Sequence, residues 1–341
     1  MKVRRILPFI LAPTLLLTGC SPAVDQKANE AALNMGNAEP AESPSASEPD
    51  GEVIAFSPID DIDLTTDILA VRTGDTLRVG GLNAARSGDW KDTTIPAGAA
   101  DVSANAGRFA VVDKSESAAL LVDAATGNAE GRISVGEDVT VAAPLSDGGI
   151  IAGSDTKQQV WVYGSDGAEK DSFGVAKGSD YVIAGSSTSD GEGADRVVRV
   201  NRFDTTIQDL HLDEGEQGGT LRVGLGVGKV AFGGDGLVLA ADATGSRLLV
   251  YTTDEVIRLH QMVPTDGSPW AVAWDPARQL AWVTSTAENT VTGYDISQGV
   301  PLEKEKFSTV AAPQSLAVLD DGTLIIGSAT GDGLQVIAPT N

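Results

Sequence analysis

The chain has 341 residues, of which 42% are hydrophobic and 21% are charged, a composition typical of a soluble globular protein. Its 24 basic and 48 acidic residues give a net charge of −24 at pH 7. Such a surface is repelled by nucleic acid and by anionic lipid headgroups, so we expect no nucleic-acid partner. The single cysteine excludes an intramolecular disulfide, so the fold must be held by burial and strand pairing.

The first 19 residues read as a signal peptide. Lys2, Arg4 and Arg5 give a positive start, and the apolar stretch ILPFILAPTLLL follows over 6–17. This stretch is too short to cross a bilayer of about 30 Å as a helix, but it has the length of a signal-peptide core.

The signal peptide ends in Leu17-Thr18-Gly19-Cys20. This sequence resembles the bacterial lipobox, in which an aliphatic residue and two small residues precede an invariant cysteine. The resemblance implies cleavage before Cys20 and a diacylglyceryl thioether on its sulfur. We therefore expect the lipid bilayer to be a partner, with the mature protein anchored on the outer face of the cell membrane. An ordinary secretory signal with a chance cysteine is the alternative.

Residues 20–51 are expected to form a lipidated, disordered tether. They are rich in Ala, Ser, Pro, Glu and Asn and show no apolar periodicity, as in AEPAESPSASEPDG. A segment of this composition buries too little apolar surface to offset the entropy of ordering it.

Residues 52–341 contain seven copies of a unit of about 42 residues, each with three or four short apolar runs separated by polar turns. This period predicts an all-β fold, a seven-bladed β-propeller with four strands in each blade. The expected inner strands start near 58, 99, 139, 180, 227, 268 and 312. No amphipathic helical pattern is visible in this region.

Turn chemistry supports the repeat. Asp147-Gly148, Asp235-Gly236 and Asp321-Gly322 occupy the same slot between the first and second strands, where a tight hairpin requires positive φ. The seventh unit ends after three strands, and EVIAFSP over 52–58 is left unassigned. We expect this N-terminal strand to complete the last blade and close the ring, which removes exposed strand edges.

The repeats resemble those of the YVTN-type propeller family of secreted and surface bacterial proteins. SPWAVAWDPARQLAWVTSTAENTVTGYDISQG over 268–299 matches the family pattern along its length, with Asn289, Thr290, Val291 and Asp295 in place. LLVDAATGNAEGRISVG over 120–136 matches the later half of the pattern, and the other units are degenerate. The resemblance implies seven blades and commonly a binding role, and it supplies no catalytic residues.

A search for catalytic motifs finds little. The chain has no G-x-S-x-G and no H-E-x-x-H sequence, and its only histidines are His211 and His260. GLGVGKVAFGG over 224–234 resembles a phosphate loop, but Val223 and Val230 stand where that motif needs Gly and Ser or Thr. We interpret its glycines as turn residues.

No cofactor is predicted, although calcium is a possible exception. Two carboxylate clusters are weak candidates for it: one contains Asp60, Asp61, Asp63 and Asp67, and the other contains Asp190, Glu192 and Asp195. A calcium loop needs oxygen ligands at alternating positions around a glycine turn, which the second cluster partly provides.

Ligands of propellers usually sit at the mouth of the central channel, which the starts of the inner strands line. The candidate ligand-binding residues at these positions are Asp101, Asp138, Asp180, Lys229, Trp270 and Gln314. We expect Trp161, Trp274 and Trp282 to pack between blades instead.

These patterns favour an anchored, non-catalytic binding or scaffold protein, with an envelope protein or a small ligand as partner. Two alternatives stay open. One is a propeller enzyme of the lactonase or quinoprotein kind, and the other is a metal-binding or chaperone propeller.

Overall fold

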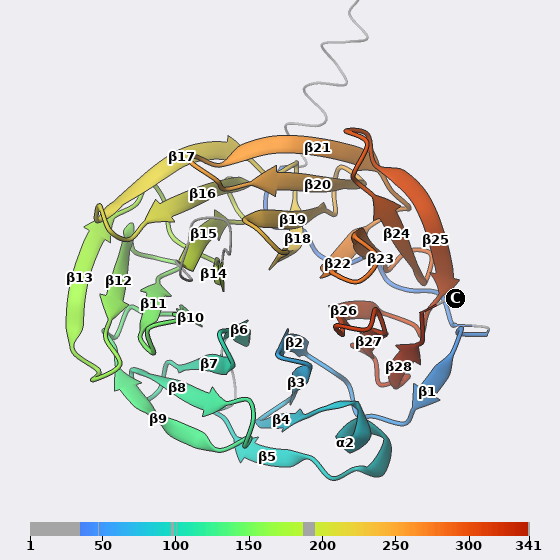
Figure 1. The fold of residues 1–341 in the computed structure, drawn as a ribbon, viewed down its shortest axis with the longest axis horizontal. Helices are drawn as coiled ribbons and strands as arrows, with labels where there is room; N and C mark the ends of the chain where they lie inside the picture. The colour runs from blue at the N-terminus through green and yellow to red at the C-terminus, as the bar shows by residue number, and fades with distance from the viewer. Residues whose placement is uncertain (1–34, 47, 97–98, 100, 187–194, 340–341) are drawn as a thin grey trace, which may run out of the picture. The chain divides into compact units, whose positions relative to one another are not determined.

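The structure, a computed structural model, describes residues 35–46, 48–96, 99, 101–186 and 195–339. Within these residues the strands form seven four-stranded antiparallel sheets. Figure 1 shows the sheets arranged as the blades of a ring, each with its first strand at the centre and its last at the rim. The chain is therefore a seven-bladed β-propeller, as the repeat predicts.

The first four blades follow each other along the chain. Blade 1 contains β2 (Asp61–Thr65), β3 (Ile68–Thr73), β4 (Thr76–Gly80) and β5 (Lys91–Thr94). Blade 2 contains β6 (Ser103–Asn105), β7 (Arg108–Asp113), β8 (Ala118–Asp123) and β9 (Ala129–Ser134). Blade 3 contains β10 (Val141–Pro144), β11 (Ile150–Gly153), β12 (Gln159–Tyr163) and β13 (Glu169–Gly174). Blade 4 contains β14 (Tyr181–Ser186), β15 (Asp195–Asn201), β16 (Thr206–His211) and β17 (Glu216–Arg222).

The last three blades complete the ring. Blade 5 contains β18 (Val227–Phe232), β19 (Leu237–Asp242), β20 (Arg247–Thr252) and β21 (Arg258–Pro264). Blade 6 contains β22 (Pro269–Asp275), β23 (Leu280–Ser285), β24 (Thr290–Asp295) and β25 (Leu302–Ser308). Blade 7 contains β26 (Pro313–Val318), β27 (Leu324–Ser328), β28 (Leu334–Ile337) and β1 (Glu52–Ile54).

The last blade is closed by the N-terminal strand, which confirms the prediction for residues 52–58. β1 pairs antiparallel with β28, with Val53 opposite Gln335. The Asp50 carbonyl accepts the Gln335 amide of β28 at 2.7 Å, and the Asp50 N–H donates to the carbonyl of Ser308 on β25 in blade 6 at 3.0 Å. The two ends of the propeller sequence thus share one sheet, and no unpaired edge is left on β28.

The predicted Asp-Gly turns adopt the expected backbone. Gly148, Gly236 and Gly322 have φ of 86°, 74° and 86°, the left-handed region that glycine enters without steric cost. These turns join the first and second strands of blades 3, 5 and 7. The Asp-Gly sequence thus determines the same hairpin geometry in all three blades.

The hydrophobic core lies between neighbouring blades. Trp282 on β23 has no exposed surface and packs in a cluster that joins blades 6 and 7, where its ring stacks on Phe307 with centroids 5.9 Å apart. Trp161 and Trp274 pack partly buried against other inter-blade clusters, as expected. Every pair of adjacent blades, including blades 7 and 1, shares such a cluster.

One short helix, α2 (Leu82–Ser87), was not predicted. It lies between β4 and β5 in blade 1 and ends at Gly88, whose φ is 81° and whose N–H donates to the Ala84 carbonyl. Only Ala85 of the helix is buried, so the helix has no apolar stripe that a periodicity search could find. Within the described residues, no helix is long and apolar enough to cross a membrane.

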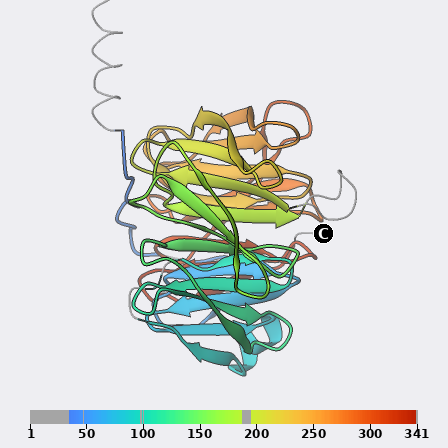
Figure 2. The ribbon, with the colours of Figure 1, turned by 90° about the vertical axis from the view of Figure 1, so that its left-hand side faces the viewer.

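Described residues ahead of the predicted boundary at residue 52 pack on the propeller. Ala38 is buried and contacts Ala243 and Trp270, and the Ala41 N–H donates to the Ser268 hydroxyl at 3.0 Å. Figure 2 shows this segment, at the blue end of the colour scale, running along one face of the propeller.

Hydrogen bonds hold the same segment farther along its path. The Ser43 hydroxyl donates to the Thr286 carbonyl at 2.6 Å, and the Asn289 amide donates to the Pro44 carbonyl at 2.6 Å. The expected tether over 20–51 is therefore too long at its C-terminal end. The predicted signal peptide over 1–19, Cys20 and the rest of the predicted tether up to residue 34 lie outside the described residues.

Candidate functional site

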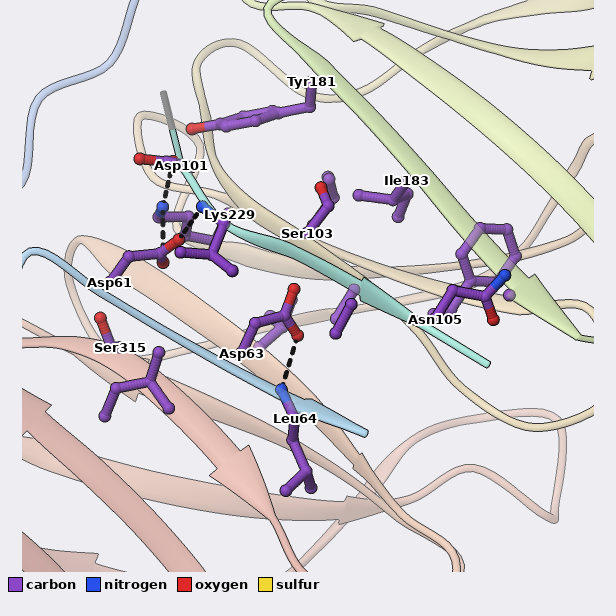
Figure 3. A pocket seen from close by; sticks show the side chains of 18 of the residues that line it. Asp61, Asp63, Leu64, Asp101, Ser103, Asn105, Tyr181, Ile183, Lys229 and Ser315 are labelled. Atoms are coloured by element: carbon purple, nitrogen blue, oxygen red, sulfur yellow. Dashed lines mark hydrogen bonds and ion pairs between the residues drawn. The ribbon is translucent and has the colours of Figure 1, made fainter. Parts of the chain in front are cut away.

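A cavity of about 270 Å³ lies where the inner strands of the blades converge. β2, β6, β14 and β18 supply most of its wall, while β10 supplies only Val141 and β22 and β26 supply two and three residues. The Ser103 hydroxyl on β6 donates to the Val182 carbonyl on β14 at 3.4 Å, so the inner strands of blades 2 and 4 are in direct contact at the centre of the ring. The cavity is the central channel of the propeller, and Figure 3 shows its polar lining.

An ion cluster occupies one level of this channel. The Lys229 ammonium lies 3.2 Å from Asp61 Oδ1 and also donates to Asp101 Oδ2. The side chains of Asp61 and Lys229 are only 8% and 20% exposed, so this charge is largely withdrawn from water. We call these three residues the channel ion cluster. It joins blades 1 and 5 with the segment that leads into blade 2.

A β-bulge places Lys229 in the channel. Val227 pairs with Asp242 and Val230 pairs with Ala240, so β18 has one more residue than β19 between these pairs. The same bulge recurs at the start of β22 and of β26. Bulges turn a side chain away from the regular alternation of a strand, and here they govern which residues of blades 5, 6 and 7 face the channel.

Aromatic rings and a second cation surround the ion cluster. Lys229 Nζ lies 5.8 Å from the centre of the Tyr181 ring, and the Arg202 guanidinium lies 5.9 Å from the rings of both Tyr181 and Trp270. Arg202 also donates to the Ala38 carbonyl. The N-terminal segment is thereby tied to the rim of the channel, and the cations are held by aromatic faces as well as by carboxylates.

The protonation states of the cluster follow from its geometry. Burial disfavours the charge of Lys229, but Asp61 and Asp101 outweigh it and raise the pKa of that ammonium. Burial also acts against the charge of Asp101, yet the attraction of Lys229 leaves the pKa of that carboxyl below its usual value. Burial raises the pKa of Asp61, although Lys229 opposes the shift. Lys229 is therefore permanently charged, and Asp101 is its ionised partner at neutral pH.

Asp63 lies farther along β2 and faces the same channel. Burial and the nearby charge of Asp61 raise the pKa of Asp63 to about 7. Its carboxylate accepts the Leu64 N–H at 2.8 Å, and it forms no ion pair with any described residue. This carboxyl therefore changes its protonation in the neutral pH range, unlike an ordinary aspartate.

The predicted channel-mouth residues divide into two groups. Asp101, Lys229 and Gln314 line the channel. Asp138 instead pairs with Lys157 at 3.4 Å on the surface.

The other two candidates are committed to the fold. Asp180 accepts the Arg202 N–H at 2.7 Å, and burial raises its pKa. Trp270 packs on Ala38 and Ala243. Neither side chain is among the described lining of the cavity.

The structure adds lining residues that the sequence search did not select as ligand-binding residues: Asp61, Asp63, Tyr181 and Ser315. The available signal was the alternation of Asp61 and Asp63 on one strand, because residues two apart face the same side of a sheet. Within the described residues the expected acidic cluster of blade 1 does not converge. Asp60 accepts the Gly74 N–H at 2.6 Å, and Asp67 accepts the Asp320 N–H at 2.7 Å.

The second predicted carboxylate cluster is described only at Asp195, since Asp190 and Glu192 lie outside the described residues. Asp195 accepts hydrogen bonds from Asn105 at 2.8 Å and from the Ser146 N–H at 2.7 Å. Among the residues that the structure describes, no group of three or more histidine, cysteine, aspartate or glutamate side chains is arranged to hold a metal ion.

The two histidines lie on β16 and β21, the third and fourth strands of their blades. His211 sits between Asp209 at 3.1 Å and Glu214 at 3.3 Å, and the hydrogen bond that its ring donates to Asp209 raises the pKa of the imidazole. Neither histidine lines the channel cavity.

The glycine-rich stretch over 224–234 encloses a carboxylate of the protein itself. The N–H groups of Leu225 and Gly226 donate to Asp242 Oδ1 at 2.9 and 3.1 Å. A Cβ at Gly224 would lie 2.2 Å from Asp242 Cγ, so glycine is required there. Gly224 and Gly226 thus lie in the turn at the corner between blades 4 and 5, as predicted, whereas residues 227–232 form β18, so Gly228 is a strand residue.

The fold and this site define a propeller with a polar, partly ionised central channel. Comparison with solved structures finds the same architecture in proteins of distant sequence. U3-55K matches with a TM-score of 0.67 at 12% identity, over 86% of this chain and 100% of that one. The WD40 propeller domain of Doa1 matches with a TM-score of 0.59 at 15% identity, over 88% and 97%.

A chain of hydrazine synthase from Kuenenia stuttgartiensis matches with a TM-score of 0.60 at 12% identity, over 86% of this chain and 99% of that one. At these identities the likeness shows the fold alone. No family model matches the sequence, and no curated protein sequence matches it either. The YVTN-type assignment therefore stays a prediction.

Proposed function

We propose that this protein is a lipid-anchored, extracytoplasmic propeller that binds a small polar ligand in its central channel without transforming it. The observation that carries the proposal is the channel ion cluster, Asp61, Lys229 and Asp101, within a cavity of about 270 Å³. A cavity of this size is at the small end of ligand sites, which favours a small molecule over a protein segment.

Energetics support a functional role for the cluster. Replacing a buried ion group with apolar side chains of similar volume is often neutral or stabilising, by about 1–4 kcal/mol. The channel ion cluster is therefore not expected to stabilise the fold more than apolar side chains would. In a channel it supplies fixed donors and acceptors that orient a polar ligand, which is the arrangement typical of small-molecule sites.

The anchor is supported by the sequence from Leu17 to Cys20. Two acyl chains on a cysteine make membrane association stable, at about 0.8 kcal/mol for each buried CH₂ group. We expect the full chain to fractionate with membranes and Cys20→Ser to be released in soluble form. Mass spectrometry of the N-terminal peptide checks the modification, and an unmodified Cys20 in a membrane-bound chain would contradict it.

Ligand-observed NMR tests the binding role. The purified full chain in detergent is mixed with a library of small polar metabolites that includes cations, anions and neutral compounds. Signals that the wild type produces should be lost in Lys229→Met/Asp61→Asn, which removes two of the three charges of the cluster. The control is Asp138→Asn, a surface position paired with Lys157. If no compound distinguishes the channel variant from the wild type, the channel is not a ligand site.

A further inference from the structure

The channel contains one carboxylate that the protein leaves without a cation. Asp61 and Asp101 share Lys229, and Asp101 is further attracted by Arg72 and Arg202. Asp63, two residues beyond Asp61 on the same face of β2, forms no ion pair with any described residue. Its partners are the backbone N–H groups of Leu64 and Ala104, which orient the carboxylate but bring no positive charge.

When its carboxylates are ionised, the described lining has a negative charge balance. It includes three carboxylates, Asp61, Asp63 and Asp101, against the single ammonium of Lys229. A cation that enters the channel therefore finds favourable potential, whereas an anion must approach these carboxylates at low dielectric. This asymmetry selects the sign of the ligand charge.

An independent observation comes from blade 7. The Ser315 hydroxyl lines the same cavity, its residue is 3% exposed, and its oxygen has no hydrogen-bond partner among the described residues. Figure 3 shows Ser315 on the side of Asp61, with Asp63 at a different level of the channel. A buried hydroxyl without a partner is costly, so a ligand group that pairs with it is stabilised there.

The wall near Asp63 suits a short apolar body. Ile183 on β14 and Ala104 on β6 line the cavity, and the Ala104 N–H bonds to the Asp63 carboxylate. These side chains offer contact to methylene groups and no competing hydrogen bonds. The cavity therefore combines an anionic acceptor, an uncommitted hydroxyl at another level and apolar surface.

We propose that the channel binds a small organic cation whose ammonium group pairs with Asp63 and whose second polar group hydrogen-bonds to Ser315. The inference rests on the proposed binding role of the channel and names the chemical class of its ligand. A primary amine with a short aliphatic chain and a hydroxyl at the other end has this character.

Binding of such a cation competes with protonation of Asp63. The charged and titratable groups around it are Asp61 on its own strand, Asp101 before β6, Tyr181 on β14 and Lys229 on β18. Lys229 stays charged and Asp101 stays ionised, and the pKa of Asp61 is raised by burial; Asp63, with a pKa of about 7, changes its protonation near neutral pH. With a pKa of about 7, its ionised fraction falls roughly 30-fold between pH 8 and pH 5.5, and the affinity for the cation falls with it.

The probe is 4-amino-1-butanol, and its binding to the full chain in detergent is measured by ligand-observed NMR titration at pH 8 and pH 5.5. Three matched compounds separate its features. In 1-pentanol a methyl group replaces the ammonium, in pentylamine a methyl group replaces the hydroxyl, and 4-hydroxybutyrate carries the opposite charge. We expect 4-amino-1-butanol to bind best, pentylamine more weakly, and the other two not at all.

Variants assign the contacts. Asp63→Asn should weaken the binding of 4-amino-1-butanol at least tenfold at pH 8 and abolish its pH dependence. Ser315→Ala should weaken 4-amino-1-butanol several-fold and leave pentylamine unchanged. Asp138→Asn should change neither, and melting temperatures confirm that each variant is folded.

The outcomes separate this inference from the proposed function. If 4-hydroxybutyrate or 1-pentanol binds in preference and the Lys229→Met/Asp61→Asn variant loses it, the channel is a ligand site but not one for cations. If Asp63→Asn binds 4-amino-1-butanol as tightly as the wild type, the assignment of the ammonium to Asp63 is wrong. If neither these probes nor the metabolite library bind, both proposals fail.

Discussion

At the residue scale, Asp63 makes the stability of the protein depend on pH in a predictable direction. Its pKa is about 7 in the folded chain against an ordinary value of 3.8, so the folded state retains a proton that the unfolded state releases between these values. Stability from this group is therefore complete below pH 3.8 and is lost as pH rises toward 7. In Asp63→Asn the loss is absent.

Between pH 5 and pH 8, without added ligand, we expect the free energy of unfolding of the wild type to fall by about 2.6 kcal/mol more than that of Asp63→Asn. Urea unfolding at several pH values measures it, with Asp138→Asn as the surface control. Parallel curves for the wild type and Asp63→Asn would show that Asp63 titrates normally.

Some residues of the site follow from their position in the repeat, and others do not. Lys229 and Gln314 were found because they stand at the starts of inner strands, where a propeller opens its channel. Trp270 has the same position in its blade, but the fold buries it against Ala38, a residue expected to belong to a free tether. From the sequence, Asp63 is only one of four nearby carboxylates in a weak calcium candidate. Its importance depends on which neighbours lack a positive charge, and this requires coordinates.

At the scale of elements, the pairing of β1 with β28 connects the two ends of the propeller. Removing residues 52–58 exposes the edge of β28, whose residues Leu334–Ile337 are all buried, and leaves blade 7 with three strands. We expect the melting temperature to fall by roughly 5–10 °C, since a few kcal/mol of lost pairing and burial shift a domain of this size by that amount.

Differential scanning calorimetry of the deletion variant tests this, and the exposed edge should also increase aggregation. A deletion of equal length over 21–27, ahead of the described residues, is the control. A melt of the 52–58 deletion that matches this control would show that β1 contributes little to closure.

Elements with periodic sequence were predictable, and those held by irregular contacts were not. The Asp-Gly hairpins follow from the rule that glycine accepts positive φ, so the blades could be placed from sequence alone. Residues 35–46 have no such pattern, because backbone carbonyls and hydroxyls fix them, as in the bond from Ser43 to the Thr286 carbonyl. α2 could not be predicted for a related reason: it buries only Ala85, so its sequence has no apolar periodicity.

At the scale of the whole molecule, the dominant electrostatic feature is the net charge of −24. The first 34 residues contain more basic than acidic residues, so the excess acid lies on the propeller. Exposed ion pairs such as Lys170 with Asp147 contribute only about 0–1 kcal/mol each and are weakened by salt. The repulsion among unpaired carboxylates acts over a longer range and opposes the compact state.

The two effects respond to salt with opposite signs, so a salt titration decides which is larger. The Debye length falls from about 30 Å at 0.01 M to about 8 Å at 0.15 M, which screens the long-range repulsion more than the close pairs. We expect the melting temperature at pH 7.5 to rise by several degrees over this range of sodium chloride. Near the pI of about 4.3 the net repulsion vanishes, and the rise should vanish with it. A melting temperature that falls with salt at pH 7.5 would mean that the local pairs outweigh the excess charge of the propeller.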